Sequence, residues 1–117
     1  MSDPSTPSGW PDSAYDKAAR EALARIEKAI DAWLDADVVD VDAARSGGML
    51  TMVLPNRTQL IVNMQPPLHE LWLAARSGGF HFRYGGGDRW LDTRSGDDFF
   101  AVLSTCLSEQ TGQVLQF

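Results

Sequence analysis

The sequence has almost no cysteine and no long apolar run, and each shortage excludes a class of protein. Cys106 is the only cysteine among 117 residues, so no intrachain disulfide can form and a reducing compartment is expected. No apolar stretch approaches the roughly 20 residues that a membrane-spanning helix needs. The first residues carry neither the basic segment nor the apolar core of a signal peptide. We therefore expect a cytoplasmic protein with no membrane contact.

Basic residues are also few. Lysine and arginine together number 10 against 16 aspartates and glutamates, which gives a net charge of −6. The acidic excess lies entirely in residues 1–44, because residues 45–117 contain equal numbers of acids and bases. Nucleic-acid phosphates bind lysine and arginine, so no nucleic-acid partner is expected. The charge favours a cation or a basic protein surface as the partner.

Hydrophobic periodicity predicts a helix, a series of short strands and a second helix. An apolar stripe at helical spacing runs through residues 15–33, and another begins at residue 99. Capping boxes of Ser13 with Asp16 and of Ser95 with Asp98 are expected to open the two helices, and Gly112 to end the second. The strands are expected at residues 38–43, 49–54, 58–64, 68–75, 80–84 and 89–92.

Two helices can cover only one face of such a sheet. We therefore expect an α+β fold built as a two-layer α/β sandwich, in which an antiparallel five- to six-stranded sheet carries the N- and C-terminal helices on one face. Residues 13–117 form the expected domain. Residues 1–12 are rich in serine, proline and aspartate and are expected to be a disordered tail.

The end of the first helix carries like charges at a spacing that opposes helix formation. Glu27, Asp31 and Asp35 recur every fourth residue, and each such pair destabilises a helix by about 0.2–0.5 kcal/mol. Asp31 and Asp35 also lie near the helix C-terminus, where the helix dipole favours cations. Residues that destabilise their own helix or strand, with no nearby interaction to compensate, are typical of functional sites.

The acidic pattern continues into the first expected strand. Val39 and Val41 alternate with Asp40 and Asp42, which predicts two carboxylates on one strand face about 7 Å apart. Our hypothesis is that this acidic stretch binds cations, a basic partner, or both. The alternative is a solvated face that only keeps a small protein soluble.

Alternation in the later strands predicts a polar outer face of the sheet with a tryptophan in it. If Leu71 and Leu73 face the helices, the residues between and before them face outward. Tryptophan and arginine on an open face are typical of interaction hot spots. The predicted outer set is Gln59, Asn63, Glu70, Trp72, His81 and Arg83. The alternatives are a Trp72 covered by a loop and a register shifted by one residue.

The central sequence resembles the signature of the frataxin family, most closely its bacterial branch. The resemblance lies in residues 63–74, NMQPPLHELWLA, followed by GGFHF at residues 78–82. Trp90, the run DTRSG at residues 92–96 and an acidic first helix that reaches Trp33 add to it. The similarity covers about residues 13–112 in the same order.

The resemblance implies a role in iron–sulfur cluster assembly. It implies weak, exposed binding of ferrous or ferric iron to Glu27, Asp31, Asp35, Asp37, Asp40 and Asp42. It also implies docking on the cysteine desulfurase and the scaffold protein, with Asn63, Glu70 and Trp72 on the partner-facing sheet, to supply iron or to regulate the assembly. The chain has Lys28 and Ala32 where bacterial relatives have acids, so its row of carboxylates is thinner. A monomer is expected, with possible iron-dependent oligomers.

Three functions remain open from the residues alone. Carboxylates accept hard cations, so iron or other divalent ions fit, but His69, His81 and Cys106 lack the spacing of a metal motif. The second function is a metal-independent binding module that meets an arginine- and lysine-rich patch. The third is an enzyme such as a ferroxidase. It is not expected, because the sequence offers no nucleophile–base pair, phosphate loop or di-metal motif.

Overall fold

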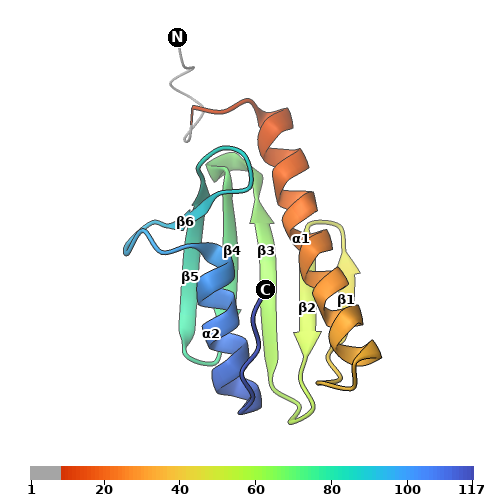
Figure 1. The fold of residues 1–117 in the computed structure, drawn as a ribbon. Helices are drawn as coiled ribbons and strands as arrows, with labels where there is room; N and C mark the ends of the chain where they lie inside the picture. Colours follow the sequence, from red (N-terminus) through yellow and green to blue (C-terminus); the bar gives the residue numbers. More distant parts are fainter. Residues whose placement is uncertain (1–8) are drawn as a thin grey trace.

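The structure of the chain is a computed structural model that describes residues 9–117 (Figure 1). A long helix is followed by six strands, with one short 3-10 turn among them, and by a second helix. In chain order the elements are α1 (Asp12–Asp35), β1 (Asp42–Ser46), β2 (Met49–Val53), β3 (Gln59–Gln65), η1 (Pro66–Leu68), β4 (Glu70–Ala75), β5 (Gly78–Tyr84), β6 (Trp90–Asp92) and α2 (Phe99–Thr111).

The strands form one antiparallel sheet in the order β1-β2-β3-β4-β5-β6. Each strand pairs with its neighbour in sequence, so short turns are sufficient to connect them. Both helices lie on the same face of the sheet, with α1 toward the β1 side and α2 toward the β5 side (Figure 1). The predicted two-layer α+β sandwich is confirmed, and the sheet has the larger of the two expected strand numbers.

The core fills the space between the sheet and the helices. In β3, Leu60, Val62 and Met64 are buried on the helix side, whereas Ile61 and Asn63 are only half-buried on the other side. The helices contribute buried side chains at helical spacing, namely Tyr15, Ala19, Leu23, Ile26, Ile30, Phe99, Leu103 and Leu107. Because both helices cover one face, the outer face of the sheet is left to solvent.

The first strand begins later than its sequence pattern predicts. Val39 and Val41 are buried, as the alternation requires, but pairing with β2 starts only at Asp42, opposite Val53. The prediction of a strand from residue 38 is therefore wrong, and Asp40 lies before the strand. The reason is geometric, since α1 continues to Asp35 and the chain uses residues 36–41 to return to the sheet.

The helix starts also differ from the predicted capping boxes. α1 begins at Asp12 after Pro11, which makes no side-chain cap, so Ser13 does not open the helix. At α2, Asp98 is itself the N-cap and accepts a hydrogen bond from the backbone N–H of Ala101. Both capping-box predictions are therefore wrong. Gly112 ends α2 in the left-handed conformation, as predicted.

The expected disordered tail falls mostly on residues 1–8, which lie outside the described residues. The rest of the tail packs against the domain. The ring of Trp10 lies 5.7 Å from that of Tyr84. An added Cβ on Gly86 would come within 2.5 Å of Trp10, and Gly86 has φ of 89°, so a side chain here would be strained and would displace the indole. Asp12 already belongs to α1.

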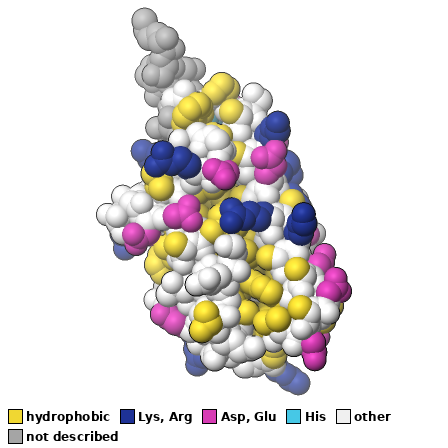
Figure 2. All heavy atoms as spheres, in the orientation of Figure 1, with side chains coloured by type: hydrophobic (Ala, Val, Ile, Leu, Met, Phe, Trp, Pro, Cys, Tyr) yellow, Lys and Arg dark blue, Asp and Glu magenta, His cyan; other side chains and the backbone are white. Residues whose placement is uncertain are grey.

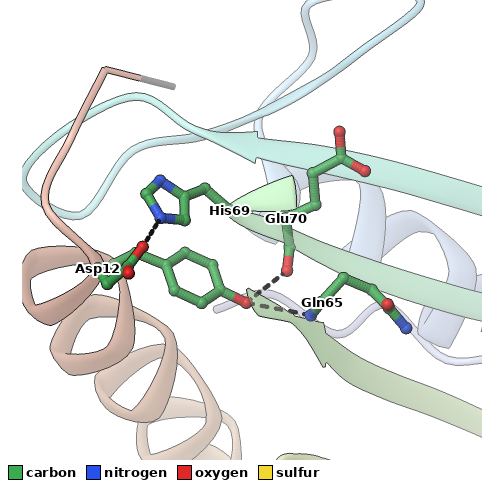
Figure 3. A network of polar contacts seen from close by, with 5 residues as sticks. Asp12, Gln65, His69 and Glu70 are labelled. Carbon is green, nitrogen blue, oxygen red and sulfur yellow. Dashed lines mark hydrogen bonds and ion pairs between the residues drawn. The ribbon is translucent and has the colours of Figure 1, made fainter. Parts of the chain in front are cut away.

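A polar network joins the first turn of α1 to the connection between β3 and β4 (Figure 3). The hydroxyl of Tyr15 donates to the carbonyl of Glu70 at 2.7 Å and accepts from the backbone N–H of Gln65 at 3.1 Å. The imidazole of His69 stacks on the Tyr15 ring, and its Nε2 lies 2.7 Å from Oδ1 of Asp12. Burial raises the pKa of Tyr15 to about 12, because the phenolate would lose its hydration.

Candidate functional site

The acidic ridge runs along the last turns of α1 and the approach to β1. We define it by the six residues predicted from the sequence, Glu27, Asp31, Asp35, Asp37, Asp40 and Asp42. Glu27 is half-buried and the other five are exposed. Acidic side chains gather at the lower right of the molecule, over the C-terminal end of α1 (Figure 2). One end of the molecule therefore carries much of its negative charge.

One carboxylate of the acidic ridge forms an ion pair with a basic residue of the same chain. Oε1 of Glu27 lies 2.8 Å from Nη1 of Arg45, which β1 presents beside α1. Within residues 9–117, the other five carboxylates form no ion pair. The part of the chain that the structure describes also holds no group of three His, Cys, Asp or Glu side chains that could hold a metal ion. The acidic ridge is thus an open row of carboxylates and not a closed cage.

A left-handed residue ends α1 inside the acidic ridge. Asp37 has φ of 56°, and its N–H donates to the carbonyl of Leu34 while the N–H of Val38 donates to that of Trp33. This pair of bonds is a Schellman motif, in which glycine is the preferred left-handed residue. Aspartate tolerates this conformation better than most residues but still less well than glycine. An aspartate therefore occupies a position at which glycine would be less strained.

The outer face of the sheet brings the second predicted set together. Cross-strand pairing places Asn63 opposite Trp72 and Trp72 opposite His81. The rings of Trp72 and His81 stack, with centroids 4.1 Å apart and planes at 7°. In the next row Arg83 lies opposite Glu70. The predicted alternation and register are therefore confirmed, although Trp72 is half-buried rather than fully exposed.

Glu70 is held by its neighbours on this outer face. Its carboxylate accepts a hydrogen bond from the indole N–H of Trp72 at 2.8 Å and lies 3.7 Å from Nη2 of Arg83. The Glu70 side chain is only 6% exposed. Figure 3 shows its carboxylate directed away from α1, while its backbone carbonyl faces the helix side. Glu70 therefore fixes the position of Trp72 and offers little free charge to a partner.

A hollow beside Trp72 was missed in the sequence analysis. A pocket of about 240 Å³ lies along the outer face, where Ala74 is paired with Gly79. The stacked rings of Trp72 and His81 form one of its sides. The sequence could have indicated this pocket, because the small residues Ala74 and Gly79 lie close to Trp72 and His81 in two neighbouring strands. Together they make a recess that fits a single apolar side chain of a partner.

The two other candidate metal ligands, His69 and Cys106, lie in the packed interior of the fold. His69 is buried and lies against Asp12 and Tyr15, far from the acidic ridge in the fold. Cys106 is buried in the core, as expected from the sequence, and burial raises the pKa of its thiol. A raised pKa leaves little thiolate near neutral pH, so Cys106 is a weak nucleophile and a weak metal ligand.

Strand order, helix placement and the two surfaces define a class of protein. A six-strand antiparallel meander with both helices on one face, an acidic ridge at one end and an aromatic outer face is a frataxin-like α/β sandwich. The family model described as a frataxin-like domain matches residues 8–113. The chain belongs to the frataxin family, as its sequence signature predicted.

Bacterial relatives are similar over nearly their whole length. The iron-sulfur cluster assembly protein CyaY of Variovorax paradoxus is 52% identical over 106 residues, which cover 91% of this chain and 96% of the relative. The protein of the same name from Paraburkholderia phytofirmans is 50% identical with the same coverage. The family is one of assembly proteins and not of enzymes, which confirms the prediction for this chain.

Solved structures agree with the fold. Frataxin from Psychromonas ingrahamii superposes with a TM-score of 0.80 at 34% identity, covering 92% of this chain and 97% of that one. Trimeric frataxin of Saccharomyces cerevisiae in a ferrous complex gives a TM-score of 0.67 at 23% identity, with coverage of 82% and 87%. At that identity the yeast protein supports the fold alone. No helix of residues 9–117 is long and apolar enough to cross a bilayer.

Proposed function

We propose that this chain is an iron–sulfur cluster assembly protein of the bacterial cytoplasm. It binds iron weakly at the acidic ridge and docks on the cysteine desulfurase and the scaffold protein, where it supplies iron or regulates the assembly. The observation that carries the proposal is a row of five exposed carboxylates that form no ion pair with any residue of the described range 9–117, in a chain about 50% identical to CyaY proteins. The protein acts as a monomer, and bound iron promotes association when carboxylates of two copies share it.

The metal part of the proposal follows from charge repulsion. Asp31 and Asp35 are one helical turn apart and near the negative end of the helix dipole, so a bound cation relieves an unfavourable arrangement. Oxygen ligands suit ferrous and ferric iron and other hard cations alike. Because no closed ligand cage exists among the described residues, the bound ion keeps most of its water. Such a site exchanges iron readily and suits transfer better than storage.

The docking part of the proposal uses the outer face of the sheet. Trp72 is held by Glu70 and by stacking on His81, so little side-chain entropy is lost when a partner covers it. Asn63 and Arg83 flank it in the neighbouring strands. A rigid aromatic side chain beside a recess is typical of an interface hot spot. The acidic ridge adds attraction to a basic surface of the partner.

Thermal unfolding with and without iron tests the metal part. We expect ferrous iron under anaerobic conditions to raise the melting temperature of the wild type. Asp31→Lys combined with Asp35→Lys should raise the melting temperature without iron by a few degrees, because it removes repulsion, and should abolish the response to iron. Glu21→Lys with Asp88→Lys, which makes the same charge change away from the acidic ridge, should keep the response. An unchanged iron response in the first variant would contradict the proposal.

A metal-independent docking module is the second candidate, favoured by the lack of a closed ligand cage among the described residues. The same variants separate the two functions when desulfurase binding is measured with metal removed. Salt-sensitive binding that is lost in the Asp31→Lys, Asp35→Lys variant, together with no iron-dependent thermal shift in the wild type, would support this candidate over iron binding.

A further inference from the structure

The layer of helices ends at α2 on the β5 side of the sheet. Of the two α-helices in the described residues, α1 lies toward β1 and α2 toward β5 (Figure 1). Phe80 is paired with Leu73, which is buried on the helix side, so the Phe80 ring points to the same side. Phe80 is nevertheless only half-buried, because no described helix lies beyond α2 to cover it.

A groove of about 360 Å³ lies between Phe80 and α2. The α2 side chains that line it follow one stripe of the helix and include Ala101, Val102, Thr105 and Cys106. Ala101 and Thr105 are small and exposed, and the Thr105 hydroxyl already donates to the carbonyl of Ala101. The groove is therefore mainly apolar, and the small side chains on its wall allow another helix to approach closely.

Carboxylates lie at both ends of the groove. Asp97 and Asp98 precede α2 at one end, and Glu109 lies in the last turn of α2 at the other. Within residues 9–117, none of the three forms an ion pair. The last turn of α2 holds no basic residue, so the helix dipole adds to the negative potential around Glu109. Hydrophobic side chains lie among acidic ones over α2 and the preceding loop (Figure 2).

The spacing of these charges matches a second helix lying alongside α2. Asp98 and Glu109 are eleven residues apart, which is about 16 Å along the helix axis. The apolar side chains of the groove come between them in the sequence of α2. Because all α-helices have the same rise per residue, a neighbouring helix with basic residues eleven positions apart places one at each end. Residues four and seven positions after the first basic residue lie on the same side of that helix and face the groove.

We propose that this groove binds an amphipathic helix of a partner protein, with two basic residues eleven positions apart and apolar residues between them. The partner helix packs beside α2 and extends the layer of helices over Phe80, as in other helix-in-groove complexes. Its basic residues neutralise carboxylates that have no ion-pair partner in the described part of the chain. The groove lies on the opposite face of the sheet from Trp72 and apart from the acidic ridge. This binding is therefore independent of iron and of docking at Trp72.

An NMR titration of the full chain with the peptide acetyl-ARAQALAQLAQARA-amide tests the proposal. Its arginines are eleven residues apart and its leucines lie between them on the same side of the helix, with a spacing that is the same in both chain directions. The control acetyl-AQARALAQLARAQA-amide has the same composition and charge, but its arginines lie on the side opposite the leucines. We expect the first peptide to shift the Ala101 and Val102 methyl signals, with a dissociation constant on the order of 1 mM. The control should bind about tenfold more weakly. Equal binding of the two peptides, or shifts confined to the acidic ridge, would overturn the proposal.

A third peptide tests whether the bound segment is helical. In acetyl-ARAQALPQLAQARA-amide, proline replaces the alanine after the first leucine, which keeps all charges and both leucines but interrupts the helix. It should also bind about tenfold more weakly than the first peptide, and equal binding would refute a helical occupant. Val102 shifts that depend on protein concentration without peptide would identify a second copy of this chain as the occupant and overturn the partner helix.

Matched variants locate the binding site. Glu109→Lys should weaken binding of the first peptide about fivefold, because it reverses the charge at one end of the groove. Glu21→Lys, the same change on α1, should leave binding unchanged. Ala101→Tyr fills the groove and should weaken binding to a similar extent, whereas Ala24→Tyr, at an exposed position of α1, should not. Ala101 and Glu109 are both exposed, so neither substitution should prevent folding. Wild-type affinity in either of these two variants would overturn the proposal.

Discussion

Arg45 shows how a single side chain changes the acidic ridge. It lies 2.8 Å from Glu27 and neutralises one end of the row, although the two residues are 18 positions apart in the sequence. The remaining carboxylates keep their charge exposed. A partly exposed pair of this kind contributes about 0–1 kcal/mol to stability. Its larger effect is that, among the described residues, the carboxylates without an ion pair in the acidic ridge are those of residues 31–42.

Tyr15 supports a prediction about alkaline stability at the same scale. Its pKa is raised to about 12 in the folded chain and is about 10 when unfolded, so the folded state favours the protonated phenol. The resulting stabilisation is complete below pH 10 and is lost as the pH rises through 12, by at most about 2–3 kcal/mol. Urea unfolding across this range measures the loss.

Tyr15→Phe isolates this contribution. It leaves the carbonyl of Glu70 and the N–H of Gln65 without their hydroxyl partner, which should cost about 1–3 kcal/mol at pH 7. The variant should also lose less stability than the wild type between pH 10 and 12. Tyr84→Phe removes one hydroxyl contact, to the carbonyl of Gly87, and should retain the alkaline loss. Identical alkaline behaviour in Tyr15→Phe and the wild type would contradict the assignment.

At the scale of the elements, the end of α1 determines the shape of the acidic ridge. The Schellman motif at Asp37 turns the chain away from the helix, and residues 36–41 then lead it to β1. Charged residues from a helix, a turn and an extended segment therefore lie at one end of the molecule. The sequence predicted the helix and the alternation of Val39 and Val41 with two aspartates but placed the strand too early.

Substitution of Asp37 tests whether the acidic side chain is retained at a cost to stability. Asp37→Gly should raise the free energy of unfolding by about 0.5–1 kcal/mol, because glycine adopts the left-handed conformation without strain. Asp37→Asn removes the charge but keeps the side chain, so it should change stability less. Both variants should weaken the thermal response to iron. Chemical unfolding gives the energies, and a destabilised Asp37→Gly would show that the side chain has a structural role.

At the scale of the whole molecule, the last residues join the two helices. After Gly112 the chain runs back along the helices (Figure 1). Leu115 is 2% exposed, and the ring of Phe117 lies 5.2 Å from that of Trp33 on α1 and 5.5 Å from that of Phe100 on α2. This segment closes one side of the core, and no periodic pattern in the sequence marks it.

Truncation of its apolar side chains should therefore be costly. Leu115→Ala should lower the free energy of unfolding by about 2–4 kcal/mol, because it leaves a cavity between the helices. Val114→Ala is the matched control, since Val114 is 84% exposed and its loss should change stability by less than about 0.5 kcal/mol. Urea denaturation of both variants compares them directly, and equal values would show that the segment does not contribute to the core.

Local periodicity was enough to predict the fold class, the two helices and the outer set around Trp72. The reason is that alternation and helical spacing encode which side of an element is apolar, and a single core requires those sides to meet. The same reasoning predicted that the acidic side chains at residues 31–42 would be exposed. The family signature added the role in assembly, which periodicity alone does not contain.

Contacts between residues far apart in the sequence were decided only by the tertiary structure. The Arg45 partner of Glu27 and the packing of Leu115 between the helices each depend on where two elements lie in space. A residue pattern specifies the face on which a side chain lies, but it does not specify the length of the neighbouring strand or the distance to the next charge. For this chain, the sequence pattern therefore predicts which residues lie on each surface. Only the tertiary structure shows whether those residues are free to contact a partner.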